Sequence, residues 1–271
     1  MSVAHLISKI MSPNKQVMPV IFIGHGSPMN ALEANRYTQV WRQLGAETPK
    51  PKAILMISAH WYIPGVAVTA MAQPKTIHDF GGFPPELFAF QYPAPGSLAV
   101  AERVKDLLAP LDVALDRTWG LDHGAWSVLA HVFPDADIPV VQLSIDRTKP
   151  NQFHYDLGKK LAGLRAEGVL ILASGNVVHN LPLINWQANT AYDWATRFEQ
   201  STKDFLARNE HQALIDYDKL GKDAQLSIPT PEHYLPLLYI MGARRDGDQV
   251  QFPVEGIELG SISMLSAKYS I

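Results

Sequence analysis

The stretch "VIFIGHGSP" (residues 20–28) places a strand-like run directly before a histidine on a glycine-flanked turn. The apolar, largely β-branched run stops at Gly24, and His25 and Gly26 follow. A continuous apolar run of this kind predicts a strand that is buried on both faces of a sheet. The glycines lack the spacing of a phosphate-binding loop, and the Lys-Ser/Thr pair that completes such a loop is missing. We therefore expect the turn to present the imidazole rather than to bind a phosphate.

Similar apolar runs recur along the chain, with helix-like segments between them. The other expected strands cover residues 53–59, 66–71, 138–145, 169–174 and 261–265. The expected helices cover residues 97–109, which open on Ser97 as an N-cap, and residues 152–167 and 188–208. This alternation predicts an α/β fold with a mostly parallel central sheet flanked by helices.

Length and composition limit the class of protein. The 271 residues fit a single domain, expected over residues 19–271 after a variable lead-in at 1–18. Hydrophobic residues make up 47%, the net charge is −3, and no cysteine is present. A nucleic-acid partner and a membrane partner are therefore not expected, and disulfides and thiolate metal sites are excluded. A cytoplasmic location is expected, because no stretch approaches the roughly 20 apolar residues that span a bilayer.

Five of the ten histidines fall where side chains gather in an α/β protein. His25, His60 and His179 follow predicted strands, whose carboxyl ends line the ligand-binding edge of such sheets. His123 lies in a glycine-containing turn, "LDHGAW". His233 is expected in the first turn of a helix that Thr230 caps and Pro231 begins.

One histidine at a strand end is usually structural, but five in such positions favour a site. Imidazole is the commonest protein ligand of zinc and iron, so the group predicts a metal centre. His5, His131, His154 and His211 lie in helical or terminal contexts and are expected to be structural.

Other chemistries have weaker support. Ser27 and Ser174 lack the G-x-S-x-G elbow of a nucleophilic serine, and no H-E-x-x-H motif of a zinc peptidase is present. The segment 72–96 is rich in proline, glycine and aromatic residues and is long for a connection, which is typical of a lid or pocket wall. Within it, Asp79 could orient an imidazole, contact a substrate or form an Asx turn before Gly81.

Seven blocks of the sequence, in order, resemble the 4,5-DOPA extradiol dioxygenases, which are class III extradiol ring-cleaving enzymes. The blocks are "GHGSPMNAL", "ISAHW", "IHDFGGFPPELFAFQYPAPG", "LDHGAWSVL", "PVVQLSID", "SGNVVHNL" and "PEHYLPLLY". The resemblance implies one α/β domain with a single divalent metal. It implies His25, His60 and His233 as ligands, His179 as a further ligand or the acid–base residue, and His123 as a second catalytic histidine. We expect His78, Asp79 and Phe80 to contact the substrate.

The wider superfamily binds its metal through two histidines and a glutamate, whereas Glu232 and His233 stand side by side here. Adjacent helical residues point about 100° apart, so we expect only His233 to be a ligand. Either Zn²⁺ or Fe²⁺ suits such a site, and Fe²⁺ is expected for ring cleavage because zinc has no redox change.

The expected reaction opens a catechol such as 3,4-dihydroxyphenylalanine (DOPA) with O₂, giving a muconic semialdehyde of the 4,5-seco-DOPA type. A zinc-dependent hydrolase with a metal-bound water and a non-enzymatic binding protein are the alternatives. The natural catechol and the oligomeric state stay open.

Overall fold

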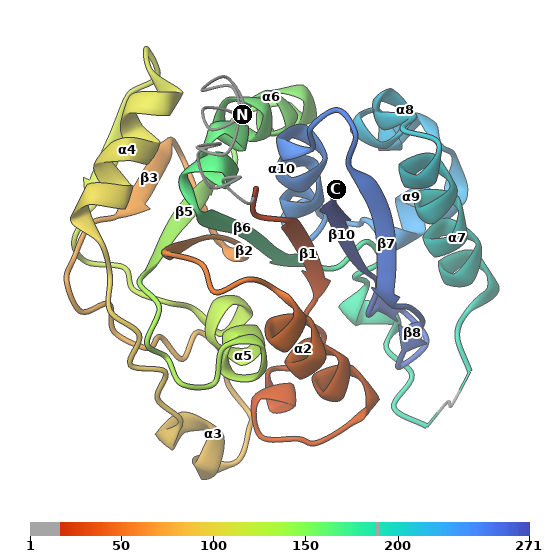
Figure 1. Ribbon diagram of the computed structural model, residues 1–271. Helices are drawn as coiled ribbons and strands as arrows, with labels where there is room; N and C mark the ends of the chain where they lie inside the picture. Colours follow the sequence, from red (N-terminus) through yellow and green to blue (C-terminus); the bar gives the residue numbers. More distant parts are fainter. Residues whose placement is uncertain (1–16, 188–189) are drawn as a thin grey trace, which may run out of the picture.

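The computed structural model describes residues 17–187 and 190–271, and within these ranges eight strands form one central sheet (Figure 1). Its strands are β1 (Val20–Gly24), β2 (Ala53–Ile63), β3 (Val66–Thr69), β4 (Val113–Asp116), β5 (Val140–Asp146), β6 (Val169–Gly175), β7 (Gln249–Val254) and β10 (Ser266–Ser270). Their order is β4-β3-β5-β2-β6-β1-β10-β7. The four middle strands, β5, β2, β6 and β1, are parallel, while β10 runs antiparallel to β1. The short strands β8 (Ile257–Glu258) and β9 (Ile262–Ser263) pair separately.

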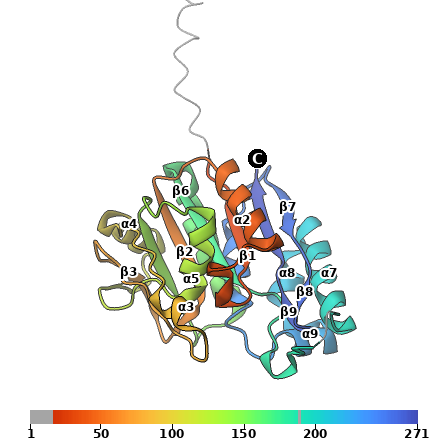
Figure 2. The same cartoon turned by 90° about the horizontal axis from the view of Figure 1, so that it is seen from below.

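Helices cover both faces of this sheet, as the α/β pattern predicts. They are α2 (Arg36–Glu47), α3 (Pro85–Ala89), α4 (Leu98–Leu108), α5 (His123–Val132), α6 (Asn151–Leu161), α7 (Asp193–Ala207), α8 (His211–Ile215), α9 (Lys222–Ser227) and α10 (Leu235–Ala243). Along β1, Val20 and Phe22 enter a core closed by α4, α6, α7 and α10, while Ile21 and Ile23 enter one closed by α2 and α5. Figures 1 and 2 show α2 and α5 together on their own side of the sheet.

Most of the predicted elements are confirmed, but several differ in their limits. β2 continues to Ile63, so His60 lies within a strand and does not follow it, and α6 ends at Leu161, before a 3-10 helix at Ala162–Glu167. β1 matches its prediction, and Ser97 caps α4 by accepting a hydrogen bond from the backbone N–H of Val100 at 3.3 Å. The expected strand at 261–265 contributes only Ile262–Ser263, and the strand that joins the central sheet follows it as β10. The helix expected at 188–208 begins at Asp193, and residues 188–189 lie outside the described residues.

Nearly all of the lead-in expected at residues 1–18, including His5, lies outside the described residues. Met18 is described and is 3% exposed. Its N–H donates to the carbonyl of Arg165 at 3.0 Å, and its own carbonyl accepts from Arg165 Nε at 2.7 Å. Among the described residues, no helix combines the length and apolar character that crossing a bilayer requires.

Arg165 forms a fully buried ion pair that ties three segments together. Its guanidinium donates to both carboxylate oxygens of Asp248, at 2.6 and 3.1 Å, and to the carbonyl of Ala243 at 3.0 Å. Both side chains of the pair are 0% exposed. With Met18, these bonds join the start of β1 to the end of α10 and to the turn before β7.

Helices α6 and α10 touch through their backbones, and a glycine of each makes this possible. A Cβ at Gly158 would lie 2.2 Å from the carbonyl oxygen of Tyr239. A Cβ at Gly242 would lie 2.1 Å from that of Tyr155. A Cβ at either position would collide with the opposite backbone, so only glycine allows the two helices to pack this closely.

Away from the clustered histidines, His154 of α6 makes folding sensitive to acid. It is 0% exposed, its Nδ1 lies 3.0 Å from the Tyr239 hydroxyl, and burial lowers its pKa to about 4. Between about pH 6.5 and 4 the unfolded chain therefore binds a proton that the folded protein does not. We expect this residue to lower the free energy of unfolding by about 2 kcal/mol between pH 7 and pH 5. Urea unfolding of His154→Phe at both pH values should show a correspondingly smaller loss, and an unchanged loss would contradict the expectation.

Candidate metal centre and active site

Five histidines from separate segments meet at the carboxyl edge of the parallel strands. His25 follows β1, His60 lies in β2, His179 follows β6, His123 begins α5, and His233 precedes α10. The ring centroids of His25, His60 and His233 lie 5.0–5.4 Å apart. His123 lies 3.8 Å from His60, and His179 stacks on His233 at 3.5 Å. Because β2, β6 and β1 are neighbours in the sheet, their ends bring three of these side chains together.

Glycines allow these segments to approach one another. Gly26 has φ +60°, and a Cβ at Gly24 would lie 2.7 Å from the carbonyl carbon of Met264. At the end of β6, the Gly175 carbonyl accepts the His25 N–H at 3.1 Å, and a Cβ there would lie 2.2 Å from the His233 carbonyl oxygen. A Cβ at Gly124 would lie 2.8 Å from His60 Cδ2. These glycines make room for neighbouring protein segments rather than for a ligand.

In the three central rings, those of His25, His60 and His233, Nδ1 faces a polar group outside the cluster. His25 Nδ1 lies 2.9 Å from the Ser174 hydroxyl, and His233 Nδ1 lies 3.2 Å from Glu232 Oε1. The Nε2 atoms therefore face the site, and those of His25 and His60 lie 3.2 Å apart. Partners on the outer nitrogen fix ring orientation and tautomer in the same way as they do around metal-bound histidines.

Asp79 provides the outer partner for two rings at once. Its Oδ1 lies 2.9 Å from His123 Nδ1, and its Oδ2 lies 3.5 Å from His60 Nδ1. The His123 N–H of the backbone also donates to Oδ1, at 2.9 Å. Burial opposes the charged form of Asp79, but these contacts hold its pKa below the usual value, so it is a carboxylate.

Four of the clustered imidazoles, those of His25, His60, His179 and His233, are neutral, which is the form that binds metals. Burial, reinforced by the neighbouring rings, lowers the pKa of His25 and of His233 well below the ordinary value. Burial and His123 lower the pKa of His60 to about 3, and burial lowers that of His179 to about 4. Neutral nitrogens that converge in a buried site fit a divalent ion such as Zn²⁺ or Fe²⁺.

The converging atoms fall into two neighbouring groups, within each of which the possible ligand atoms lie within 4.8 Å of one another. One group is His25, His60 and His123, and the other is His179, Glu232 and His233. The ligand set expected from the sequence takes two histidines from each group. Glu232 Oε1 contacts the outer nitrogen of His233, which suits a supporting carboxylate better than a second ligand from the same turn.

Two further local expectations are wrong. His123 does not lie in a turn, because α5 begins at this residue with Asp122 as its N-cap. His233 does not lie in a helical turn either, because α10 begins only at Leu235. Thr230 does not cap that helix but donates its hydroxyl to Glu232 Oε1 at 2.8 Å. His233 therefore lies in a turn before α10, where its ring contacts Glu232 and its carbonyl accepts the N–H of Asn176.

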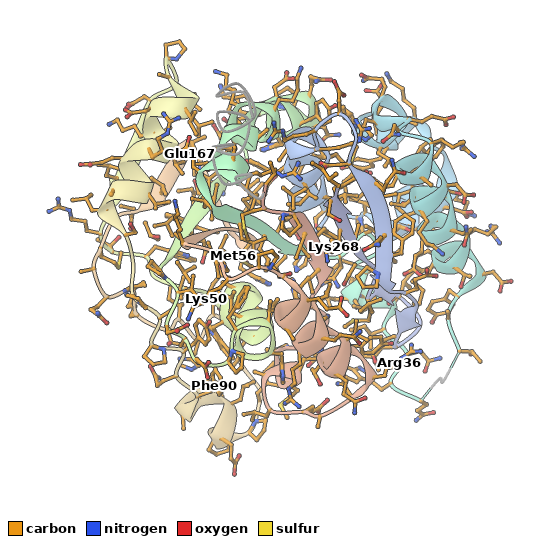
Figure 3. The ribbon with its side chains drawn as sticks, in the orientation of Figure 1. Arg36, Lys50, Met56, Phe90, Glu167 and Lys268 are labelled. Carbon is orange, nitrogen blue, oxygen red and sulfur yellow. The ribbon has the colours of Figure 1, made fainter. Side chains whose placement is uncertain are left out.

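The aromatic segment 72–96 forms one wall of the site. Phe80 meets His123 edge to face, with centroids 5.4 Å apart, and His78 Nε2 lies 3.0 Å from the Phe90 carbonyl. Figure 3 labels Phe90 on the side of the molecule that carries α3, below Met56 in this view. Asp79 makes no Asx turn with Gly81, since its carboxylate faces the two histidines instead.

A buried polar network behind the site was not anticipated from the sequence. Asp122 is fully buried, and its carboxylate accepts hydrogen bonds from the Ser58 hydroxyl at 2.6 Å and from Gln142 Nε2. Burial raises its pKa to about 6. The available signals were a carboxylate directly before His123 and a serine two residues before His60.

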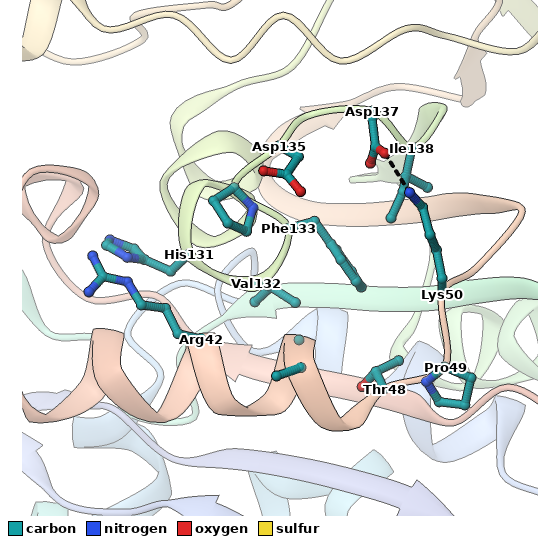
Figure 4. Close-up of a pocket in the computed structure, with 13 residues that line it drawn as sticks. Arg42, Thr48, Pro49, Lys50, His131, Val132, Phe133, Asp135, Asp137 and Ile138 are labelled. Atoms are coloured by element: carbon teal, nitrogen blue, oxygen red, sulfur yellow. Dashed lines mark hydrogen bonds and ion pairs between the residues drawn. The ribbon is translucent and has the colours of Figure 1, made fainter.

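A groove of about 640 Å³ lies elsewhere, between α2 and the segment after α5 (Figure 4). Its walls include Arg42, Lys50, His131 and Asp137, and Lys50 pairs with Asp137. None of the clustered histidines lines it. His131, His154 and His211 also lie outside the cluster and bond to Asn30, Tyr239 and Tyr155, respectively.

Comparison with known proteins identifies the family of this chain. Residues 19–267 match the family described as the catalytic LigB subunit of aromatic ring-opening dioxygenase. The chain is 53% identical, over 96% of both chains, to the 4,5-DOPA dioxygenase extradiol of Escherichia coli K12. It is 36% identical to the protein of that name from Beta vulgaris, over 96% of this chain and 99% of that one. A crystal structure of the uncharacterized protein JW3007 from E. coli K12 superposes with a TM-score of 0.83 at 49% identity, covering 93% of this chain and 100% of that one.

With these matches the chain is an α/β oxidoreductase, and the histidine cluster at the carboxyl edge of its sheet is its candidate metal centre. The chain belongs to the LigB family of aromatic ring-opening dioxygenases, and the resemblance seen in its sequence is confirmed.

Proposed function

We propose that this enzyme opens the ring of a catechol such as DOPA with O₂, in the extradiol sense, to give a product of the 4,5-seco-DOPA type. The observation that carries the proposal is the convergence of five histidines, with the neutral rings of His25, His60 and His233 at its centre. Relatives named 4,5-DOPA dioxygenase extradiol support the choice of substrate. They favour ring opening over the zinc-dependent hydrolase that the sequence left as an alternative.

We propose that His25, His60 and His233 hold one divalent metal through Nε2, with His179 beside them as a further ligand or as the base. Bound there, Fe²⁺ would supply the electron transfer between catechol and O₂. Zn²⁺ could not, because it does not change its oxidation state. The rings reach the site already oriented, because Ser174, Asp79 and Glu232 contact their outer nitrogens.

The remaining residues act on the substrate itself. His179 is neutral, and neither of its ring nitrogens has a hydrogen-bonding partner among the described residues, so it can accept the proton of a catechol hydroxyl. His123 would donate or accept a hydrogen bond at the reacting oxygens. His78 and Phe80 would contact the aromatic ring from the wall formed by residues 72–96, and this wall would exclude water.

The role of His179 can be separated from metal binding. We expect His179→Gln to retain the metal and to lose about 100-fold or more in kcat, because a positioned base contributes about 10²–10⁴-fold. Metal content of the purified variant and turnover at saturating catechol are the measurements. Loss of the metal together with activity would make His179 a ligand instead.

The function itself is tested by oxygen uptake after anaerobic loading with Fe²⁺. DOPA and simple catechols are the substrates, and colour and product mass are recorded. A yellow product that has gained two oxygen atoms supports ring cleavage. No uptake by verified iron-loaded protein would contradict it.

Domain limits at 19–271 and a cytoplasmic location stay predictions.

A further inference from the structure

We infer that Asp79 is a positioning residue that aims His60 and His123 together, and not a contact of the substrate. The inference deepens the proposed function and rests on it for the roles of the two histidines. It replaces the substrate-binding role expected for Asp79 from the sequence.

The two carboxylate oxygens are divided between two rings from different elements. Oδ2 faces His60 Nδ1 at 3.5 Å, whereas Oδ1 faces both the Nδ1 and the backbone N–H of His123, each at 2.9 Å. The His60 and His123 rings are themselves only 3.8 Å apart between centroids. Asp79 thus spans the outer edge of the pair, and both of its oxygens face protein.

The contact with the His123 ring is close but not a well-directed hydrogen bond, since the ring N–H does not point at Oδ1. The directed bond to His123 comes from its backbone. The carboxylate therefore fixes the first residue of α5 and places negative charge beside both rings. A carboxylate on the outer nitrogen of a ligand histidine also makes the inner nitrogen more basic.

The segment that carries Asp79 is fastened to the chain around His123. The N–H of Ile77 donates to the Leu121 carbonyl at 2.7 Å, and that of Leu121 donates to the Lys75 carbonyl at 2.9 Å. Trp126 Nε1 donates to the Ile77 carbonyl at 2.8 Å. These bonds hold Asp79 in place from both sides of His123. The wall 72–96 is therefore part of the frame that aims the histidines, in addition to covering them.

Metal affinity distinguishes positioning from substrate binding. We expect Asp79→Ala to weaken Co²⁺ binding by about 10–100-fold, the usual effect of removing such an outer partner. The visible absorption of bound Co²⁺ should change as well, because His60 loses its orientation. In the Fe²⁺ enzyme kcat should fall more than KM rises. Asp79→Asn keeps the shape and the backbone bond and should give a smaller effect in the same direction. Glu86→Gln, an exposed carboxylate change in α3 of the same segment, should alter none of these values.

Chelator competition with Co²⁺, the Co²⁺ spectrum and steady-state kinetics are the measurements, and Asp79→Asn carries the test should Asp79→Ala not fold. Unchanged Co²⁺ affinity and spectrum with a raised KM would overturn the inference and make Asp79 a substrate contact. Co²⁺ binding does not depend on turnover. An inactive wild-type enzyme would therefore count against the proposed function while leaving this measurement valid.

Discussion

Replacing His25 by alanine should remove the bound metal and lower kcat/KM for catechol cleavage by well over 100-fold. Loss of an outer partner of a metal ligand already costs about 10–100-fold, so loss of a central ligand should exceed that range. His25 is the ring around which the others lie, 5.1 Å from His60, 5.4 Å from His233 and 5.9 Å from His123.

The measurements are metal content after loading with excess Fe²⁺ and oxygen uptake with DOPA. His211→Ala is the matched control, because His211 is partly buried and bonds Tyr155 outside the cluster. Circular dichroism should show both variants folded. Stoichiometric metal bound to His25→Ala with wild-type affinity would contradict the ligand assignment.

Replacing Arg165 by methionine should lower the free energy of unfolding by about 3–5 kcal/mol, the usual cost of leaving one member of a buried ion pair alone. The change strands the Asp248 carboxylate, which is 0% exposed and bonds the guanidinium through both oxygens. It also removes the donors to the Met18 and Ala243 carbonyls. Burial of an unpaired charge dominates the effect, since methionine fills most of the volume.

Urea unfolding at pH 7 measures this loss of unfolding free energy, and two further variants serve as controls. Arg103→Met breaks a similar bidentate pair with Glu167 on the surface, where we expect a much smaller loss because water solvates both charges. Arg165→Met combined with Asp248→Leu removes both charges and should recover part of the stability. A loss below about 1 kcal/mol for Arg165→Met alone would show that Asp248 finds another partner.

The sheet could be predicted where each strand is a continuous apolar run buried on both faces, as in β1 and β6. The prediction failed where the buried apolar residues are not the residues that pair as a strand. Met264 and Leu265 are buried, yet their backbones bond to Gly256 and Gly24 outside the strand ladders. The paired strand is the less apolar Ser266–Ser270, which β1 and β7 hold between them.

The candidate site could be located because His25 and His179 follow strands, and His60 lies near the end of a strand, that parallel pairing brings together. Its supporting groups could not be predicted, because they come from tertiary contacts. Asp79 reaches His123 across 44 positions of the sequence, and no local pattern marks that meeting. The helix α5 was missed for a related reason: nearly all of its residues are buried, so it has no polar face to give a helical period.

The glycine contacts between α6 and α10 imply that a residue far from the candidate active site can tolerate mutation as poorly as a residue within it. Gly158 and Gly242 touch none of the clustered histidines, but a single methyl group at either would collide with the opposite backbone. α10 begins two residues after His233, so a displacement of this helix would reach the site through the chain itself. In a library of random variants, these two positions should be as restricted as the histidines, although nothing in their own chemistry suggests it.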